Sequence, residues 1–382
     1  MIYFDNAASS WPKPPDVLKE VELTMRFRGG NPSRGGHTLS KVAGQTVYRC
    51  REKLAEHFGE QPERVIFTPG ATYALNFVMK SVIGEGDHFL ISDMEHNAVL
   101  RVAYALQKKG AMFDTFDAAA AEQAMLAEIR SKVRKNTVAL VCIHASNVVP
   151  LTLPIEEIAR QCSRMGILCI VDAAQSAGHR EIRMDSAPID ALCLPGHKGL
   201  LGPQGCGCII LSPKMAKRME CGRTLIEGGS GILSEDTVMP SQLPERYEPG
   251  TQPTPLIAGL YAGVRFLERI GYNEIVQRER DVYSVLKEGL LNMDGVILYM
   301  PSQADGNLLL FNVEGISTSK LGNYFDTHGV CLRSGFHCAP MAHRKLQTGS
   351  EGAIRISIGW NNTKKEAVSF LCSLYRVIKE LK

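Results

Sequence analysis

Short apolar runs alternate with amphipathic stretches through the middle of the chain. The runs with the length of strands lie at 64–68, 88–93, 112–116, 137–143, 167–172, 189–194 and 206–211. Helices are predicted between them at 71–83, 97–109, 121–134 and 154–165. Strand-like runs separated by helix-length segments are typical of right-handed crossovers in a mostly parallel, buried sheet. Because such sheets bind ligands at the carboxyl ends of their strands, we expect the chemistry directly after these runs.

The pattern changes near residue 255. The elements predicted from there on are a long helix at 255–293, strands at 307–313, 330–333 and 353–358, and a terminal helix at 363–381. We therefore predict a large α/β domain at 31–254 and a smaller α+β domain at 255–382. The opening segment, 1–30, is expected to pack on the small domain or to line the cleft.

Composition narrows the class of protein. The chain has 382 residues, a formal net charge of +3 and 45% hydrophobic residues, as in ordinary soluble proteins. This balance gives no reason to expect nucleic acid or a membrane as partner, and no apolar run reaches the length of a membrane span. The N-terminus lacks a basic leader and an apolar signal core, so we expect a cytoplasmic protein. The 11 cysteines include no Cys-x-x-Cys pair, so we expect mostly reduced core residues and no bound metal.

A lysine follows one of the predicted strands. Lys198 stands in the turn Gly196-His197-Lys198-Gly199, after the strand 189–194. A lysine in a loop is usually a solvated surface charge. The neighbouring residues here are apolar, namely Leu194, Pro195, Leu200 and Leu201. Burial among them would lower the lysine pKa and free its amine to form a Schiff base.

Asp172 closes another apolar strand, in the sequence Val-Asp-Ala-Ala-Gln that ends at Gln175. One interpretation makes Asp172 the N-cap of a following helix. The other makes it the anionic partner of a protonated pyridine nitrogen, which keeps the ring an electron sink. Gln175 could then donate to the phenolic oxygen of the ring.

A glycine turn leads from the strand 64–68 into the predicted helix 71–83. Gly70 would expose the free N–H groups and the positive end of the helix dipole to an anion, and Thr72 would add a hydroxyl. Such turns are mostly structural when they occur alone. Together with Asp172 and Lys198, the turn predicts a phosphate, a pyridinium partner and a Schiff base on one edge of the sheet.

Two polar motifs also follow strands. They are Glu95-His96-Asn97 and His144-Ala145-Ser146-Asn147. A single histidine in such a place is more often a satisfied polar residue than a catalyst. The imidazole of His96 could stack on a flat cofactor ring and move protons near neutral pH.

As an ordered set, these motifs and the segment 333–340 (Arg-Ser-Gly-Phe-His-Cys-Ala-Pro) resemble the class V aminotransferase superfamily of fold-type I pyridoxal phosphate enzymes. Within it, the chain is similar to the cysteine desulfurase and selenocysteine lyase family. The subgroup is the one whose catalytic cysteine follows Arg-[Ser/Thr]-Gly-x-His. The resemblance runs from Phe4 to Arg355. It implies a mostly parallel sheet flanked by helices, a smaller α+β domain, pyridoxal 5′-phosphate as cofactor and a homodimer.

The family pattern implies roles for matching positions. The cofactor-binding positions are Gly70, Ala71, Thr72, His96, Asn147, Asp172, Gln175, His197, Lys198 and Thr251. The substrate-binding positions are Ala7, Arg34, Asn147 and Arg355. Lys198 would hold the Schiff base, and Arg355 would clamp the substrate α-carboxylate because its fork matches two oxygens. Thr251 would reach the phosphate of the partner subunit, and Arg34 would enter the neighbouring site.

Cys338 is the cysteine that the resemblance singles out. Most cysteines are inert core residues, so a catalytic role for Cys338 depends on the residues around it. His337 and Arg333 precede it in a glycine-containing loop, and cationic neighbours favour the nucleophilic thiolate. The catalytic residues implied are therefore Lys198, His96 and Cys338, with a persulfide formed on Cys338.

The chain also departs from the family pattern at the expected phosphate site. Pro195 stands where many relatives carry Ser or Thr, and Ala71 stands where a second Thr is common. Two hydroxyl donors are therefore missing, and we expect cofactor binding to persist but weaken. Each lost neutral hydrogen bond is worth roughly 0.5–1.5 kcal/mol.

The predicted function is conversion of L-cysteine to L-alanine, with sulfur passed from Cys338 to an acceptor protein. A selenocysteine lyase or a cysteine sulfinate desulfinase shares every motif. Another class V reaction, or a non-catalytic persulfide carrier, is a further alternative. Lys198, Asp172, His96 and Arg355 argue against the carrier, which needs none of them.

Overall fold

The computed structural model describes residues 1–32, 35–301, 304 and 306–381. Within this part of the chain, the large sheet has seven strands in the order β2-β8-β7-β6-β5-β3-β4. The strands are β2 (Val65–Thr68), β3 (His88–Ser92), β4 (Met112–Phe116), β5 (Thr137–Ile143), β6 (Leu168–Asp172), β7 (Ala191–Pro195) and β8 (Gly207–Leu211). They confirm every strand predicted before residue 212. β3 to β7 run parallel to one another, whereas β8 is antiparallel to both β7 and β2.

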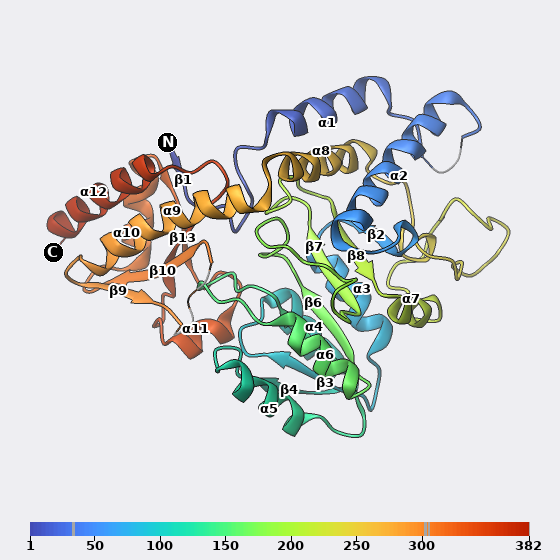
Figure 1. Cartoon of the computed structure of the whole chain (residues 1–382), viewed down its shortest axis with the longest axis horizontal. Coiled ribbons are helices and arrows are strands. Elements are labelled where there is room, and N and C mark those ends of the chain that lie inside the picture. The colour runs from blue at the N-terminus through green and yellow to red at the C-terminus, as the bar shows by residue number, and fades with distance from the viewer. Residues whose placement is uncertain (33–34, 302–303, 305, 382) are drawn as a thin grey trace.

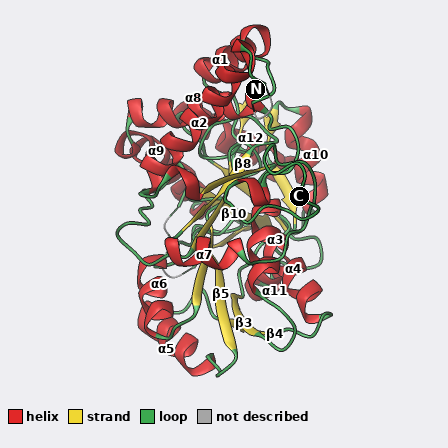
Figure 2. Ribbon diagram, turned by 90° about the vertical axis from the view of Figure 1, so that its right-hand side faces the viewer, coloured by secondary structure: helices red, strands yellow, loops and turns green. Residues whose placement is uncertain are grey.

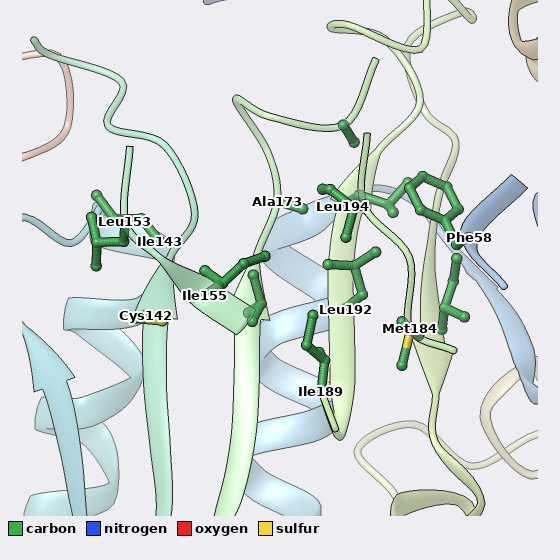
Figure 3. Packing of buried hydrophobic residues seen from close by; sticks show 14 of the residues in the cluster. Phe58, Cys142, Ile143, Leu153, Ile155, Ala173, Met184, Ile189, Leu192 and Leu194 are labelled. Atoms are coloured by element: carbon green, nitrogen blue, oxygen red, sulfur yellow. The ribbon is translucent and has the colours of Figure 1, made fainter. Parts of the chain in front are cut away.

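Helices cover both faces of this sheet. They are α2 (Thr38–Phe58), α3 (Ala71–Val82), α4 (Asn97–Gln107), α5 (Glu122–Lys132), α6 (Ile155–Arg164), α7 (Pro213–Glu220) and α8 (Thr254–Ile270), whereas α1 (Pro15–Phe27) packs on α8. Successive strand residues point to opposite faces. Leu140 and Cys142 pack toward α2, α5, α6 and α8, as Figure 3 shows for part of this core, whereas Val141 packs toward α3, α4 and α7. Figure 2 shows α5 and α6 on one side of β3–β5, with α3 and α4 on the other. The sheet is thus buried on both faces, as predicted.

A second layered unit occupies the C-terminal part of the chain (Figure 1). Its elements are α9 (Tyr272–Leu291), β9 (Val296–Tyr299), β10 (Leu308–Val313), α10 (Thr318–Thr327), β11 (Val330–Cys331), β12 (Arg333–Gly335), α11 (Pro340–Leu346), β13 (Ala353–Ser357) and α12 (Lys364–Leu381). An antiparallel sheet in the order β12-β13-β10-β9 packs on these helices. The N-terminal strand β1 (Ile2–Tyr3) pairs with β11, and Phe4 is buried in the same core.

Two predicted elements are wrong in detail. The long helix at 255–293 is broken at Gly271, which has φ +88° and ends α8 before α9 begins. A residue with a β-carbon adopts this conformation only with strain, so glycine permits the break. The strand at 330–333 is split, because β11 pairs in parallel with β1 while β12 pairs antiparallel with β13.

The position of α8 bears on the domain division. Ile257, Leu260 and Val264 of α8 lie in the same hydrophobic core as one face of the large sheet, and α8 packs along α1 and α2. The predicted boundaries at 30 and 254 stay a prediction, and this packing favours a boundary near Gly271 instead. Across the described residues, no helix combines the length and apolarity needed to cross a membrane.

Candidate active site

A cavity of about 270 Å³ opens at the carboxyl ends of the central strands. Every predicted cofactor residue of the large sheet lines it. These residues are Gly70, Ala71, Thr72, His96, Asn147, Asp172, Gln175, His197 and Lys198. They come from loops far apart in sequence, which the parallel topology gathers at one edge.

Lys198 is positioned by the turn that follows β7. Gly196 N–H donates to Cys206 O at 2.7 Å, and Leu201 N–H donates to Lys198 O at 2.9 Å. The turn packs closely, because a β-carbon at Gly199 would lie 2.2 Å from Ala177 O. Burial lowers the pKa of Lys198 to about 8, while the Asp172 carboxylate opposes this shift. A lysine with this pKa has an appreciable fraction of free amine near neutral pH.

Asp172 is fully enclosed at the end of β6. Burial raises its pKa, whereas the N–H of Ala174 and the charge of Lys198 act in the opposite direction. Oδ1 accepts from Ala174 N–H at 2.9 Å, and this is a local turn bond rather than a helix cap. The N-cap alternative is therefore wrong, and Asp172 lines the cavity together with Lys198, with which it interacts electrostatically.

The glycine turn leads into α3 as predicted. Gly70 is the N-cap residue, and within the described chain no side chain caps this helix. The first N–H groups of α3 therefore remain available to an anion. The Nδ1 atom of His197 is buried nearby in the same cavity and has no hydrogen-bond partner among the described residues. Burial and the charge of Lys198 lower the pKa of His197 to about 4, so its ring is neutral.

His96 is the N-cap of α4. Its Nδ1 accepts from Ala98 N–H at 3.0 Å, so the hydrogen of the neutral ring lies on Nε2. Burial and the charge of Lys198 lower the pKa of His96 to about 4. A neutral imidazole with a fixed tautomer therefore faces the cavity.

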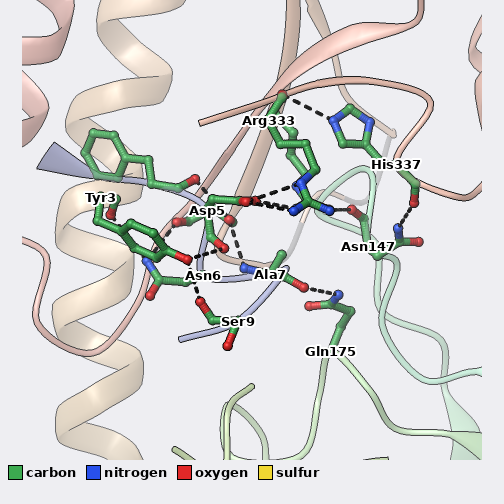
Figure 4. Close-up of polar contacts among 12 residues, drawn as sticks. Tyr3, Asp5, Asn6, Ala7, Ser9, Asn147, Gln175, Arg333 and His337 are labelled. Carbon is green, nitrogen blue, oxygen red and sulfur yellow. Dashed lines mark hydrogen bonds and ion pairs between the residues drawn. The ribbon is translucent and has the colours of Figure 1, made fainter. Parts of the chain in front are cut away.

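Arg355 lies on β13 and is 2% exposed. Nη1 donates to Asn147 O at 2.8 Å and Nη2 donates to Asp5 Oδ1 at 2.9 Å (Figure 4). Asp5 Oδ2 also accepts from Arg333 at 3.1 Å, so one carboxylate holds two guanidinium groups. Arg355 Nε and Asn147 Oδ1 are buried and lack partners within the described chain. Asn147 lines the cavity, and its carbonyl holds Arg355 directly behind this lining residue.

Ala7 and Gln175 join the N-terminal segment to the cavity. Gln175 Nε2 donates to Ala7 O at 3.0 Å, and Ala7 N–H donates to Ser357 Oγ at 2.9 Å. Gln175 lines the cavity while its amide holds the main chain of Ala7. The structure thus places Ala7 beside the site, next to the residues that anchor Arg355.

Cys338 is exposed on the loop between β12 and α11. It lies close enough to act on the pKa values of both Lys198 and Arg355. The expected cationic histidine beside it is wrong, because burial and Arg355 lower the pKa of His337 to about 2. The cationic groups that interact with the thiol are instead Lys198 and Arg355.

Of the two positions assigned to the partner subunit, the structure describes Thr251, which is not among the residues that line the cavity. Thr251 is exposed, and its Oγ1 accepts from Asn31 Nδ2 at 3.5 Å. Arg34 falls outside the described residues. The roles of both stay predictions.

Sequence reasoning missed two residues of the site. Asp5 directly follows Phe4, where the resemblance begins, yet no role was given to its carboxylate. Glu95 is buried behind the cavity, where Oε1 accepts from Ile143 N–H at 2.9 Å, and burial raises its pKa to about 8. The signal available in the sequence was the position of Glu95 directly before His96.

Comparisons with known proteins identify the family and support the fold. The family description "Aminotransferase class-V" matches residues 2–370. A probable cysteine desulfurase of Pyrococcus abyssi is 29% identical over 392 residues, covering 100% of this chain and 95% of that protein. One of Xylella fastidiosa is 30% identical over 389 residues, covering 100% and 92%. The apo structure of cysteine desulfurase from Thermococcus onnurineus NA1 superposes with a TM-score of 0.91 at 29% identity, covering 100% of this chain and 95% of that one.

Proposed function

The chain belongs to the class V aminotransferase family, and from this premise we propose that it is a pyridoxal-phosphate-dependent cysteine desulfurase. The observation that carries the proposal is the single cavity that combines Lys198, Asp172 and the open N-terminus of α3, with Cys338 nearby. The predicted fold-type I architecture is confirmed. The relatives named as probable cysteine desulfurases support the choice of reaction.

The residues of the cavity fit pyridoxal phosphate on their own chemistry. The uncapped helix N-terminus and the unpartnered Nδ1 of His197 offer donors to a phosphate. Lys198 has the lowered pKa that a Schiff-base lysine needs, and Asp172 supplies a carboxylate beside it. Bound there, the cofactor would supply an electron sink for the substrate α-carbon.

The protein's own groups then position the substrate and move protons. Arg355 is the group that we propose binds the substrate α-carboxylate, and the bonds to Asp5 and Asn147 hold its guanidinium plane. The Lys198 amine, with a pKa of about 8, can accept and return a proton near neutral pH.

The sulfur step uses Cys338 as nucleophile. Its thiolate attacks the substrate sulfur, so that an S–S bond forms and the substrate C–S bond breaks. The electron pair of the C–S bond goes to the substrate carbon, which takes a proton. The substrate thus leaves as alanine, and Cys338 carries the persulfide. The sulfur atoms are oxidised and the carbon is reduced, so no other oxidant is needed.

An assay of alanine release together with sulfide tests this proposal. With a thiol reductant present, the wild-type protein is expected to release both products from L-cysteine in equal amounts. Selenocysteine and cysteine sulfinate, tested in parallel, distinguish a lyase or a desulfinase from a desulfurase. Alanine formation from either of these without sulfide release from cysteine would contradict the desulfurase assignment.

The proposal includes a homodimer and a protein that accepts the sulfur. Thr251 and Asn31 are exposed and hydrogen-bonded to each other, and Asn31 precedes Arg34 by three positions in the sequence. If Thr251 completes the phosphate site of a partner subunit, activity requires the dimer. Sedimentation is therefore expected to give twice the chain mass of 41.9 kDa. A fully active monomer would refute this part of the proposal.

A further inference from the structure

The backbone at Cys338 adopts an uncommon conformation. His337 and Cys338 have φ values of +49° and +55°, so two successive residues with β-carbons occupy the left-handed region. Such residues occupy this region at an energetic cost, and they remain there only when surrounding contacts hold them. The direction in which the thiol points therefore depends on groups outside the two residues.

Two hydrogen bonds hold the carbonyl groups of these residues. Asn147 Nδ2 donates to His337 O at 2.6 Å (Figure 4), and the N–H of Asn97 donates to Cys338 O at 2.7 Å. Asn97 is the first residue of α4, where an N–H has no acceptor within the helix. Its protection from solvent therefore reports directly on the position of Cys338 O.

The side chain of His337 is held by a chain of bonds whose hydrogens can be assigned. Nε2 lies 3.3 Å from Arg333 O, and a carbonyl can only accept, so Nε2 carries the hydrogen. Burial keeps the ring neutral, because the pKa of His337 is lowered to about 2. Nδ1 must then accept, and its partner at 3.0 Å is His343 Nε2.

The ring hydrogens of His343 can be assigned in the same way. This residue lies on α11 and is 2% exposed. Since its Nε2 donates to His337, and burial lowers the pKa of His343 to about 4, its Nδ1 must accept. That acceptor faces Thr348 Oγ1 at 2.8 Å, which donates. His337 in the loop, His343 on α11 and Thr348 just after α11 therefore form a neutral chain of hydrogen bonds with a single direction.

We infer that His343, acting through His337, is a positioning residue that keeps the Cys338 loop in its left-handed turn. The nucleophilic role of Cys338 in this inference rests on the proposed function. His343 lies five residues beyond Cys338 along the chain. Its Nε2–H nevertheless donates to the imidazole of His337, the residue that directly precedes Cys338. Losing that donor would leave His337 Nδ1 buried and unsatisfied, which favours release of the loop.

The test compares three variants with the wild type. His343→Leu removes the donor, His343→Gln keeps an N–H that can reach His337, and Thr348→Val removes only the far end of the chain. Arg344→Gln is the matched control, because Arg344 is the next residue of α11 and is exposed. The first readout is hydrogen exchange of the Asn97 amide in cofactor-free protein, and the second is kcat and KM for sulfur release.

The expected result is about tenfold faster Asn97 exchange in His343→Leu and about threefold in Thr348→Val, with His343→Gln near the wild type. The kcat of His343→Leu is expected to fall about tenfold while KM changes less than threefold, and Gln restores most of it. If His343→Leu does not fold, the exchange rate of the Asn97 amide in Thr348→Val provides the test instead. Asn97 exchange within twofold of Arg344→Gln would overturn the inference, whatever the activity. If the wild type released no sulfur while Asn97 exchange still changed in the His343 and Thr348 variants, that result would instead contradict the proposed function.

Discussion

Lys198→Ala is expected to abolish sulfur release from cysteine, by about a thousandfold or more. The Lys198 amine belongs to the cavity that Asp172 and the uncapped N-terminus of α3 also line. Without it, the protein loses both the covalent anchor and the group placed to move the substrate proton. The wild type is expected to be yellow, with a visible band that borohydride treatment removes and fixes to the peptide bearing Lys198.

Lys19→Ala is the control, since Lys19 lies exposed on α1. It is expected to keep the band and the activity. A Lys198→Ala protein that retained a borohydride-reducible linkage would show that another lysine holds the cofactor.

The lowered pKa of Lys198 makes the same prediction testable without cofactor. Burial stabilises the neutral amine, so the pKa falls from 10.5 to about 8. At pH 7 about a tenth of the amine is then free, compared with fewer than about one in a thousand at the ordinary pKa. Acylation of Lys198 in cofactor-free protein is expected to speed up as the pH rises, with a midpoint near 8. A midpoint near 10.5 would mean that the amine is solvated.

The large sheet could be predicted because its strands are buried on both faces. Such strands appear as continuous apolar runs, and β5 and β6 are clear instances. The break between α8 and α9 was missed because amphipathic periodicity continues on both sides of Gly271. Edge strand β9 was missed because its residues are only partly buried, and exposed strands lose the apolar signature.

The cavity was predictable for a related reason. Parallel topology places every strand end at one edge, so residues that follow strands must converge there. The contact between Asp5 and Arg355 was not predictable, because 350 positions separate them and no local pattern pairs them. The neutral state of His337 was also hidden, since it depends on burial by distant parts of the chain.

Cys338→Ser is expected to lose sulfur release by at least about a hundredfold while keeping the visible band, because a serine hydroxyl is a far weaker nucleophile than a thiolate. Cys221→Ser and Cys372→Ser are matched controls, since both cysteines are exposed and lie outside the cavity lining. Both are expected to retain full activity. Release of selenium from selenocysteine is expected to survive in part in Cys338→Ser, because selenium leaves more easily than sulfur.

The chemical form of Cys338 after one turnover shows whether this residue is the nucleophile or takes no part in the reaction. Attack on the substrate sulfur must leave one extra sulfur atom on this residue before any acceptor or reductant removes it. Mass spectrometry after a single turnover with cysteine is therefore expected to find that sulfur on the peptide bearing Cys338. The thiol is placed for this attack, because Cys338 lies close enough to Lys198 and Arg355 to influence the pKa values of both. An active enzyme with unmodified Cys338, or a Cys338→Ser variant with undiminished sulfur release, would assign the transfer to a different group.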